Sequence, residues 1–272
     1  MKRVINGFEM NFEDVGEGPA LLLVHGFPFD HSMWTYQMEA LKQDYRVIAP
    51  DLRGHGQSEA TSGPYRMDLM ADDLRALLLE LEVERAHLAG LSMGGYILFA
   101  FWRIYPHVVH ALILSDTRAT ADTPAGRQNR QQMIEQVRAE GTQLIAEQMV
   151  PRLLSPSTLE KKPAVVSHAR RMILNTPVDG VVGALQGMAQ RPDSTPTLET
   201  ITVPTLILVG EEDAVTPPEA AAEMQAGIQS PRRGEAPEVE LVRIPQAGHL
   251  SPLENPEAFN PALRRFLQKH AG

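Results

Sequence analysis

Short, continuous apolar runs separated by helix-length segments are the feature that most constrains this fold. Continuous rather than alternating apolar residues are typical of strands covered on both faces, as in a parallel sheet. Helices between such strands give crossover connections, so the pattern predicts an α/β fold with a doubly wound sheet. The strands are expected at residues 20–24, 46–49, 86–89, 111–114, 205–209 and 239–244, and the clearest helices at residues 32–43, 67–80, 94–105 and 256–269.

Two parts of the chain depart from this alternation. Residues 1–15 indicate an antiparallel start, with a turn at Asn6-Gly7 between two short strands. The strand pattern then stops at Asp116 and resumes at Val203. The stretch between them has helical patterns and many prolines but no convincing strand, which predicts a helical insertion over the sheet.

Composition excludes several classes of function. The formal net charge of −9 argues against nucleic acid and anionic membranes as partners, because both need a basic surface. The absence of cysteine excludes disulfides, thiolate zinc sites and a cysteine nucleophile. No metal-binding motif is present, and polar residues interrupt the apolar start that a signal peptide would need. We therefore expect a cytoplasmic protein without a bound metal, and whether it forms a homo-oligomer stays open.

Residues 90–94 (Gly-Leu-Ser-Met-Gly) fit the G-x-S-x-G pattern of a nucleophile elbow. A predicted strand precedes the motif and a predicted helix follows it, as the sharp turn requires. Glycines on both sides leave room for the turn, so the Ser92 hydroxyl would be exposed at the strand's carboxyl end. The alternative is a helix N-cap serine between incidental glycines.

A serine hydroxyl needs a neighbouring base to act as a nucleophile. His249 follows the last predicted strand, which places it at the same sheet edge as Ser92, and an imidazole can exchange a proton near neutral pH. Asp213 follows the strand at residues 205–209 and is the preferred carboxylate to orient His249. Its rivals are Glu211 and Glu212 in the same loop and Asp116 after an earlier strand.

Acyl transfer builds negative charge on the carbonyl oxygen, and backbone N–H groups must already point towards it. The expected oxyanion-hole donors are the N–H groups of Met93, directly after the nucleophile, and of Phe27, in the loop after residues 20–24. His25 is interpreted as a structural residue that bonds nearby backbone. Methionines of the insertion are weak candidates for lining a substrate site, namely Met133, Met149 and Met188.

Taken together, these motifs resemble the α/β-hydrolase superfamily over essentially the whole chain. They stand in the expected order at residues 25–28 (His-Gly-Phe-Pro), 51–58 (Asp-Leu-Arg-Gly-His-Gly-Gln-Ser), 90–95 (Gly-Leu-Ser-Met-Gly-Gly), 210–213 (Gly-Glu-Glu-Asp) and 248–249 (Gly-His). The resemblance implies an eight-stranded, mostly parallel sheet and no cofactor. It also implies a core domain of residues 1–117 and 199–272 and a helical cap of residues 118–198.

Within the superfamily the chain is similar to small bacterial esterases, 3-oxoadipate enol-lactonases and perhydrolases. This similarity implies a serine hydrolase that cleaves small carboxylic esters or lactones through an acyl-enzyme on Ser92. An enol-lactone with a carboxylate would need a cationic partner, for which the candidates are Arg118, Arg127 and Arg130. Cleavage of amides or C–C bonds, perhydrolysis, and a role as a hydrolase-fold ligand-binding protein remain alternatives.

Overall fold

The computed structural model describes residues 1–232 and 234–271, and it is built around a sheet of eight strands in the order β1-β2-β4-β3-β5-β6-β7-β8. Strands β1 and β2 form an antiparallel hairpin, β2 also pairs antiparallel with β4, and the other neighbouring strands are parallel. The mixed, mostly parallel sheet is therefore confirmed. The strands are β1 (Lys2–Ile5), β2 (Phe8–Val15), β3 (Ala20–Val24), β4 (Arg46–Pro50), β5 (Ala86–Leu91), β6 (Val109–Ser115), β7 (Thr205–Gly210) and β8 (Val239–Ile244).

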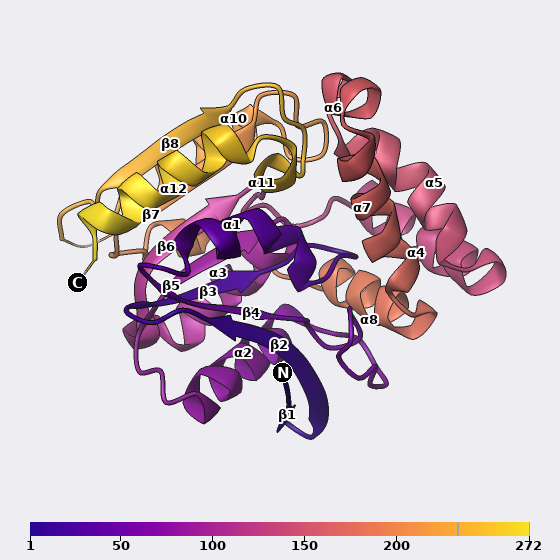
Figure 1. The fold of residues 1–272 in the computed structure, drawn as a ribbon, viewed down its shortest axis with the longest axis horizontal. Helices are drawn as coiled ribbons and strands as arrows, with labels where there is room; N and C mark the ends of the chain where they lie inside the picture. Colours follow the sequence, from indigo (N-terminus) through magenta and orange to yellow (C-terminus); the bar gives the residue numbers. More distant parts are fainter. Residues whose placement is uncertain (233, 272) are drawn as a thin grey trace.

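Helices cover the sheet, which explains why its central strands are apolar along their whole length. Every residue of β5 and β7 is buried, whereas the edge strand β8 has partly exposed residues. Figure 1 shows the sheet with helices packed along it, α1 next to α12 and α2 next to α3. These core helices are α1 (Thr35–Leu41), α2 (Met67–Glu80), α3 (Met93–Ile104), α10 (Pro218–Ile228), α11 (Ser251–Glu254) and α12 (Pro256–Lys269).

The chain between β6 and β7 forms six helices joined by loops and contains no strand, as the sequence predicted. In Figure 1 its pink and orange helices gather beyond one end of the sheet. The exact division into a core and a cap of residues 118–198 stays a prediction, and the core's last residue, 272, lies outside the described residues. The inserted helices are α4 (Pro124–Glu140), α5 (Thr142–Leu153), α6 (Pro156–Lys161), α7 (Pro163–Asn175), α8 (Val178–Ala189) and α9 (Thr195–Leu198).

Glycines on α8 allow the insertion to lie directly against the core. A Cβ on Gly180 would lie 1.8 Å from the carbonyl oxygen of Gly54, and one on Gly187 would lie 1.7 Å from that of Tyr65. The Tyr65 N–H also donates to the Gly183 carbonyl at 2.8 Å. Side chains at these positions would push α8 away from the core, so the glycines set the height of the insertion above the sheet.

The sheet direction brings the candidate residues to one edge. Strands β3 and β5 to β8 are parallel, so their carboxyl ends meet at the same edge, where the inserted helices also lie. Phe27, Ser92, Asp213 and His249 follow β3, β5, β7 and β8 respectively. Among the described residues no helix has both the length and the apolar character needed to cross a membrane.

Candidate active site

Ser92 sits at a sharp turn between β5 and α3. Its backbone has φ 54° and ψ −111°, a combination that is strained for a residue with a side chain. The flanking glycines are sterically required there. A Cβ on Gly90 would lie 2.6 Å from the carbonyl carbon of Gly94, and a Cβ on Gly94 would lie 2.4 Å from the Val24 carbonyl oxygen. The strand–turn–helix geometry is therefore that of a nucleophile elbow rather than of an ordinary N-cap.

Three distant side chains form one hydrogen-bonded row at this edge. The Ser92 hydroxyl lies 2.9 Å from Nε2 of His249, and Nδ1 of His249 lies 2.8 Å from Oδ2 of Asp213. The imidazole and the carboxylate are buried. The hydroxyl can donate to Nε2 only if Nδ1 carries the proton and donates to Asp213, and this is the tautomer that a general base needs.

The Asp213 carboxylate is fixed by its own loop. The N–H groups of Val215 and Thr216 donate to Oδ1 at 2.8 and 3.0 Å, and the Thr216 hydroxyl donates to Oδ2 at 2.7 Å. Burial opposes ionisation of Asp213, but His249 and these donors hold its pKa below the ordinary value. Glu211 and Glu212, the rivals in the same loop, are exposed.

The same arrangement tunes His249. Burial disfavours the charged imidazole, but the neighbouring Asp213 carboxylate outweighs burial and raises the pKa of His249 above that of an ordinary histidine. The Glu254 carboxylate acts in the same direction. The imidazolium that forms when Ser92 loses its proton would therefore be stabilised.

A cavity of about 350 Å³ opens onto Ser92 and His249. Helices of the insertion form much of its wall, and all three methionines considered in the sequence line it. Phe27 also lines it. The remaining apolar part comes from Tyr96, Leu153, Leu185, Ala214 and Val215.

The wall of the cavity also contains three arginines. Arg118, Arg130 and Arg152 line it together with the carboxylate of Asp122. Arg118 and Arg130 both bond Asp122, while Nε of Arg118 is buried without a hydrogen-bond partner among the described residues. Arg127 reaches only the Asp122 carbonyl and is not among the lining residues. Two of the three candidate arginines thus face the cavity, and Arg152 was missed because no sequence motif marks it.

Asp122 is ionised at neutral pH and only partly balances this positive charge. Burial opposes its ionisation, but Arg130 and Arg191 lower the pKa of Asp122 to about 2. Arg191 bonds Asp122 at 2.8 Å and is itself stacked 4.1 Å over the Tyr96 ring. One carboxylate therefore holds three arginines in place, and the cavity wall keeps a net positive charge in a chain whose overall charge is negative.

The expected oxyanion-hole donors belong to elements that adjoin Ser92. Met93 is the first residue of α3, and Phe27 lies in the loop after β3. A Cβ on Gly26 would lie 3.3 Å from the Ser92 Cβ, so this loop lies against Ser92. His25 has the structural role expected of it, because Nδ1 bonds the Gly26 carbonyl and Nε2 accepts the Leu52 N–H, both at 2.9 Å. The roles of Met93 and Phe27 stay a prediction.

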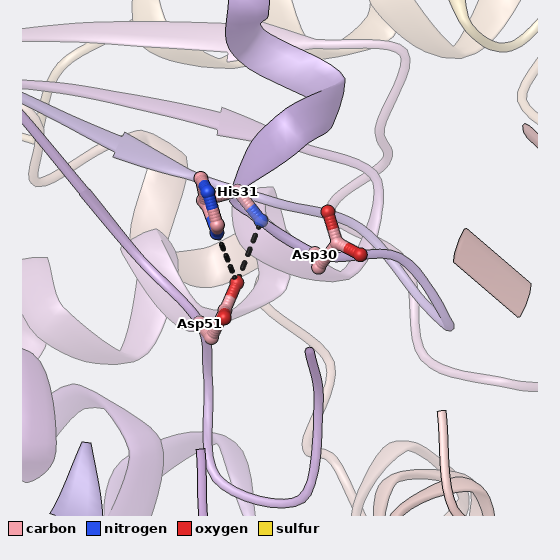
Figure 2. A group of neighbouring side chains, drawn as sticks. All are labelled: Asp30, His31 and Asp51. Atoms are coloured by element: carbon pink, nitrogen blue, oxygen red, sulfur yellow. Dashed lines mark hydrogen bonds and ion pairs between the residues drawn. The ribbon is translucent and has the colours of Figure 1, made fainter. Parts of the chain in front are cut away.

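Asp30, His31 and Asp51 form a cluster away from the row (Figure 2). Their ligating atoms lie within 4.8 Å of one another, a grouping that the sequence did not indicate. However, Oδ1 of Asp51 already accepts the backbone N–H of His31 at 2.8 Å and bonds its Nδ1 at 2.7 Å, and Oδ2 accepts Asn11 Nδ2 and the Gln57 N–H, both at 2.8 Å. The acceptor positions of Asp51 are thus occupied, and its hydrogen bonds connect the loop after β3 to the end of β4. We therefore assign no metal ion to this cluster.

Comparison with known proteins agrees with this architecture. The model of the alpha/beta hydrolase fold family matches residues 19–256. A thermophilic esterase from Thermogutta terrifontis, solved with malate bound, is 45% identical and has a TM-score of 0.93, with 100% of this chain and 99% of that chain covered. The AB hydrolase superfamily protein YisY of Bacillus subtilis is 35% identical, and the alignment covers 93% of each chain.

A second kind of relative acts on lactones. 3-Oxoadipate enol-lactonase 2 of Acinetobacter baylyi is 29% identical over 96% of this chain and 93% of its own length. The family match spans most of the chain, and the sheet and the helical insertion have the arrangement of that family. The chain therefore belongs to the α/β-hydrolase fold family.

Proposed function

We propose that this protein is a serine hydrolase that cleaves small carboxylic esters, including lactones, through an acyl-enzyme on Ser92. The observation that carries the proposal is the row of Ser92, His249 and Asp213, with links of 2.9 and 2.8 Å, at the floor of a cavity. The similarity to an esterase with a TM-score of 0.93 supports the same reaction class.

In the first step Ser92 attacks the ester carbonyl while Nε2 of His249 takes the hydroxyl proton. Asp213 keeps the imidazole oriented and stabilises its charged form. The N–H groups of Phe27 and Met93 would hold the oxyanion. His249 then gives the proton to the leaving alkoxide, and the alcohol departs. Water attacks the acyl-enzyme in the same way, with His249 as base, and releases the acid.

The test is hydrolysis of p-nitrophenyl acetate by Ser92→Ala. We expect the turnover number to fall by about 10³-fold or more, because the nucleophile is lost while the fold survives. Ser167→Ala is the matched control, because Ser167 is an exposed serine on α7. An unchanged turnover number in Ser92→Ala would overturn the assignment.

A ligand-binding protein with this fold is the alternative outside enzymology. A fluorophosphonate reacts only with an activated serine, so mass spectrometry should locate the adduct at Ser92 and nowhere else. Failure to label Ser92 in the folded protein would favour the binding role. Amide hydrolysis, C–C bond cleavage and perhydrolysis share the same row of residues, and they are distinguished by assaying each class of substrate.

A second candidate function is hydrolysis of an ester or lactone that carries a carboxylate, as in an enol-lactonase. The arginines of the cavity wall favour it, since Arg118 has an unpaired buried Nε and Arg152 forms no ion pair with another described residue. A carboxylate matches the planar, fork-shaped donors of arginine. The enol-lactonase relative and the malate bound to the similar esterase are consistent with this candidate.

The second candidate is tested with monomethyl and dimethyl glutarate, which share an acyl chain and differ in one negative charge. We expect kcat/KM to favour the monoanion by about tenfold or more, because a hydrogen bond to a charged group contributes about 1.5–3 kcal/mol. Arg152→Met should reduce that ratio, whereas Arg138→Met, an exposed control on α4 with the same charge change, should not. An equal preference for the two esters in the wild type would remove the second candidate and leave the first intact. The cytoplasmic location and any homo-oligomer stay predictions from the sequence.

A further inference from the structure

Glu254 is a fully buried carboxylate that none of the preceding steps uses. It is the last residue of α11, the short helix that directly follows the loop carrying His249. Its Oε1 accepts the N–H groups of Gly248 at 2.9 Å and Leu250 at 3.2 Å. These are the residues on either side of His249, so one carboxylate oxygen holds both peptide groups that flank the base.

The other oxygen of Glu254 reaches the insertion. Its Oε2 accepts the N–H of Ser155 at 2.7 Å, in the short segment between α5 and α6. Beside this bond, the His249 N–H donates to the Leu153 carbonyl at 2.7 Å. The Ser155 hydroxyl also lies 3.3 Å from the Gln246 carbonyl, at the start of the same loop. The loop of the base and the insertion are therefore joined backbone to backbone, with Glu254 at the centre of the junction.

The junction also adjoins the substrate cavity. Leu153 lines the cavity, and its carbonyl accepts the His249 N–H. A movement of this wall would consequently be transmitted to the backbone of His249. A Cβ on Gly248 would lie 2.8 Å from the Ser155 nitrogen and 2.9 Å from the Leu153 oxygen, so the fit leaves no room for a side chain.

We propose that Glu254 is a positioning residue for His249, which holds the base in reach of Ser92 only while residues 153–155 of the insertion are seated on the loop. The inference rests on the proposed hydrolase function. A carboxylate suits this task because all three of its partners are N–H donors and it has no proton of its own to compete with them. Bonds to an ionised acceptor are stronger than those to a neutral one.

The charge of Glu254 also reaches the imidazole. Burial opposes protonation of His249, whereas the carboxylates of Asp213 and Glu254 favour the protonated ring. Asp116 also faces the imidazole, but its pKa is raised to about 8, so its charge contributes only as the pH approaches that value. Removing the Glu254 charge should therefore lower the pKa of His249. The acid limb of the pH–rate profile therefore distinguishes the two possibilities, because it would not shift if Glu254 were only structural.

The test is Glu254→Gln, which keeps the shape of the side chain but replaces one acceptor oxygen with an NH₂ group. That group would face at least one N–H donor and could not accept its hydrogen bond. We expect kcat to fall by about tenfold to a hundredfold, as for small misplacements of a catalytic group, while KM changes little. The acid limb of kcat/KM should shift to lower pH. Glu257→Gln, an exposed glutamate in the first turn of α12, is the matched control and should leave kcat and the acid limb unchanged.

Active-site titration with a fluorophosphonate gives kcat per folded, reactive molecule. If Glu254→Gln is less stable but keeps the wild-type kcat and acid limb on this basis, Glu254 is merely structural and the proposal is rejected. Gly248→Ala addresses the same junction without touching the carboxylate, in case the first variant does not fold. A fully active Gly248→Ala enzyme would overturn the proposal. Either result, with Ser92 still essential, would leave the hydrolase function itself standing.

Discussion

Asp116 and Asp213 follow the neighbouring strands β6 and β7, and of the two only Asp213 contacts the His249 imidazole. Asp116 instead accepts the Gly210 N–H at 2.8 Å and bonds the hydroxyl of Ser251 at 2.5 Å. Gly210 is the last residue of β7, directly before the Asp213 loop, and Ser251 is the first residue of α11, two positions after His249. Asp116 thus joins the segments that carry Asp213 and His249, while Asp213 bonds the His249 imidazole directly.

Asp213→Asn should test this division of roles. An amide in place of the carboxylate can hold the wrong tautomer of His249 and cannot stabilise its charge, so kcat should fall by about 10³–10⁴-fold. Glu212→Gln, in the same loop but exposed, is the control and should retain wild-type kcat. A kcat for Asp213→Asn within tenfold of the wild type would mean that another carboxylate orients His249.

The pH dependence of ester hydrolysis should report the raised pKa of His249. The base must be neutral to accept the Ser92 proton, so kcat/KM should rise with pH as His249 loses its proton. Because the Asp213 carboxylate raises that pKa despite burial, the midpoint of the acid limb should lie above the ordinary histidine value of about 6.5. Rates measured between pH 5 and 9 in buffers of constant ionic strength check this. A midpoint well below 6.5 would contradict the assigned environment.

The sequence predicted the sheet because its signals are local. The strand at residues 205–209 is a continuous apolar run after Thr205, and the structure buries all of β7, so the local run of apolar residues was enough to place it. The turn at Ser92 could be predicted equally well, because only glycine fits at positions 90 and 94, where a Cβ would meet backbone within 3 Å. These features depend on residues close together in the chain, and they were correct to within a few residues.

The cavity wall could not be predicted in the same way. Glu254 bonds Ser155, 99 residues away in the sequence, and Arg152 lines a cavity whose wall is assembled from several distant segments. Neither residue belongs to a motif that fixes its partner. The sequence proposed Arg127 on equal terms with Arg118, but helix α4 turns Arg127 towards the Asp122 carbonyl. Which side chain of an amphipathic helix faces a cavity depends on how the helix packs against the rest of the protein. The sequence of the helix alone does not determine that packing.

Asp116→Asn should change how stability depends on pH. Burial and the nearby Asp213 charge raise the pKa of Asp116 to about 8 in the folded state. The unfolded chain releases this proton near pH 4, so the folded state binds more protons between about pH 4 and 8, and its stability falls as pH rises through that window. Asparagine does not titrate and tolerates the positive φ of 45° at this position. The melting temperature of Asp116→Asn should therefore drop less between pH 6 and 8.5 than that of the wild type.

The control for this measurement is Asp179→Asn, an exposed aspartate on α8, which should keep the wild-type dependence of melting temperature on pH. A parallel pH dependence in the wild type and Asp116→Asn would mean that Asp116 is already ionised at neutral pH in the folded protein.

Gly94→Ala tests the steric basis of the elbow. The added Cβ would lie 2.4 Å from the Val24 carbonyl oxygen and 3.0 Å from that of His25, and both contacts are with backbone that cannot rotate away. Relieving them requires α3 to move from β3, so the free energy of unfolding in urea should fall by about 1–3 kcal/mol. Gly126→Ala is the matched control, because its Cβ would meet no atom closer than 3.4 Å and alanine favours the helix by up to about 1 kcal/mol. Equal unfolding free energies for the two variants would show that β3 and α3 are not in the close contact that holds Ser92 at its turn.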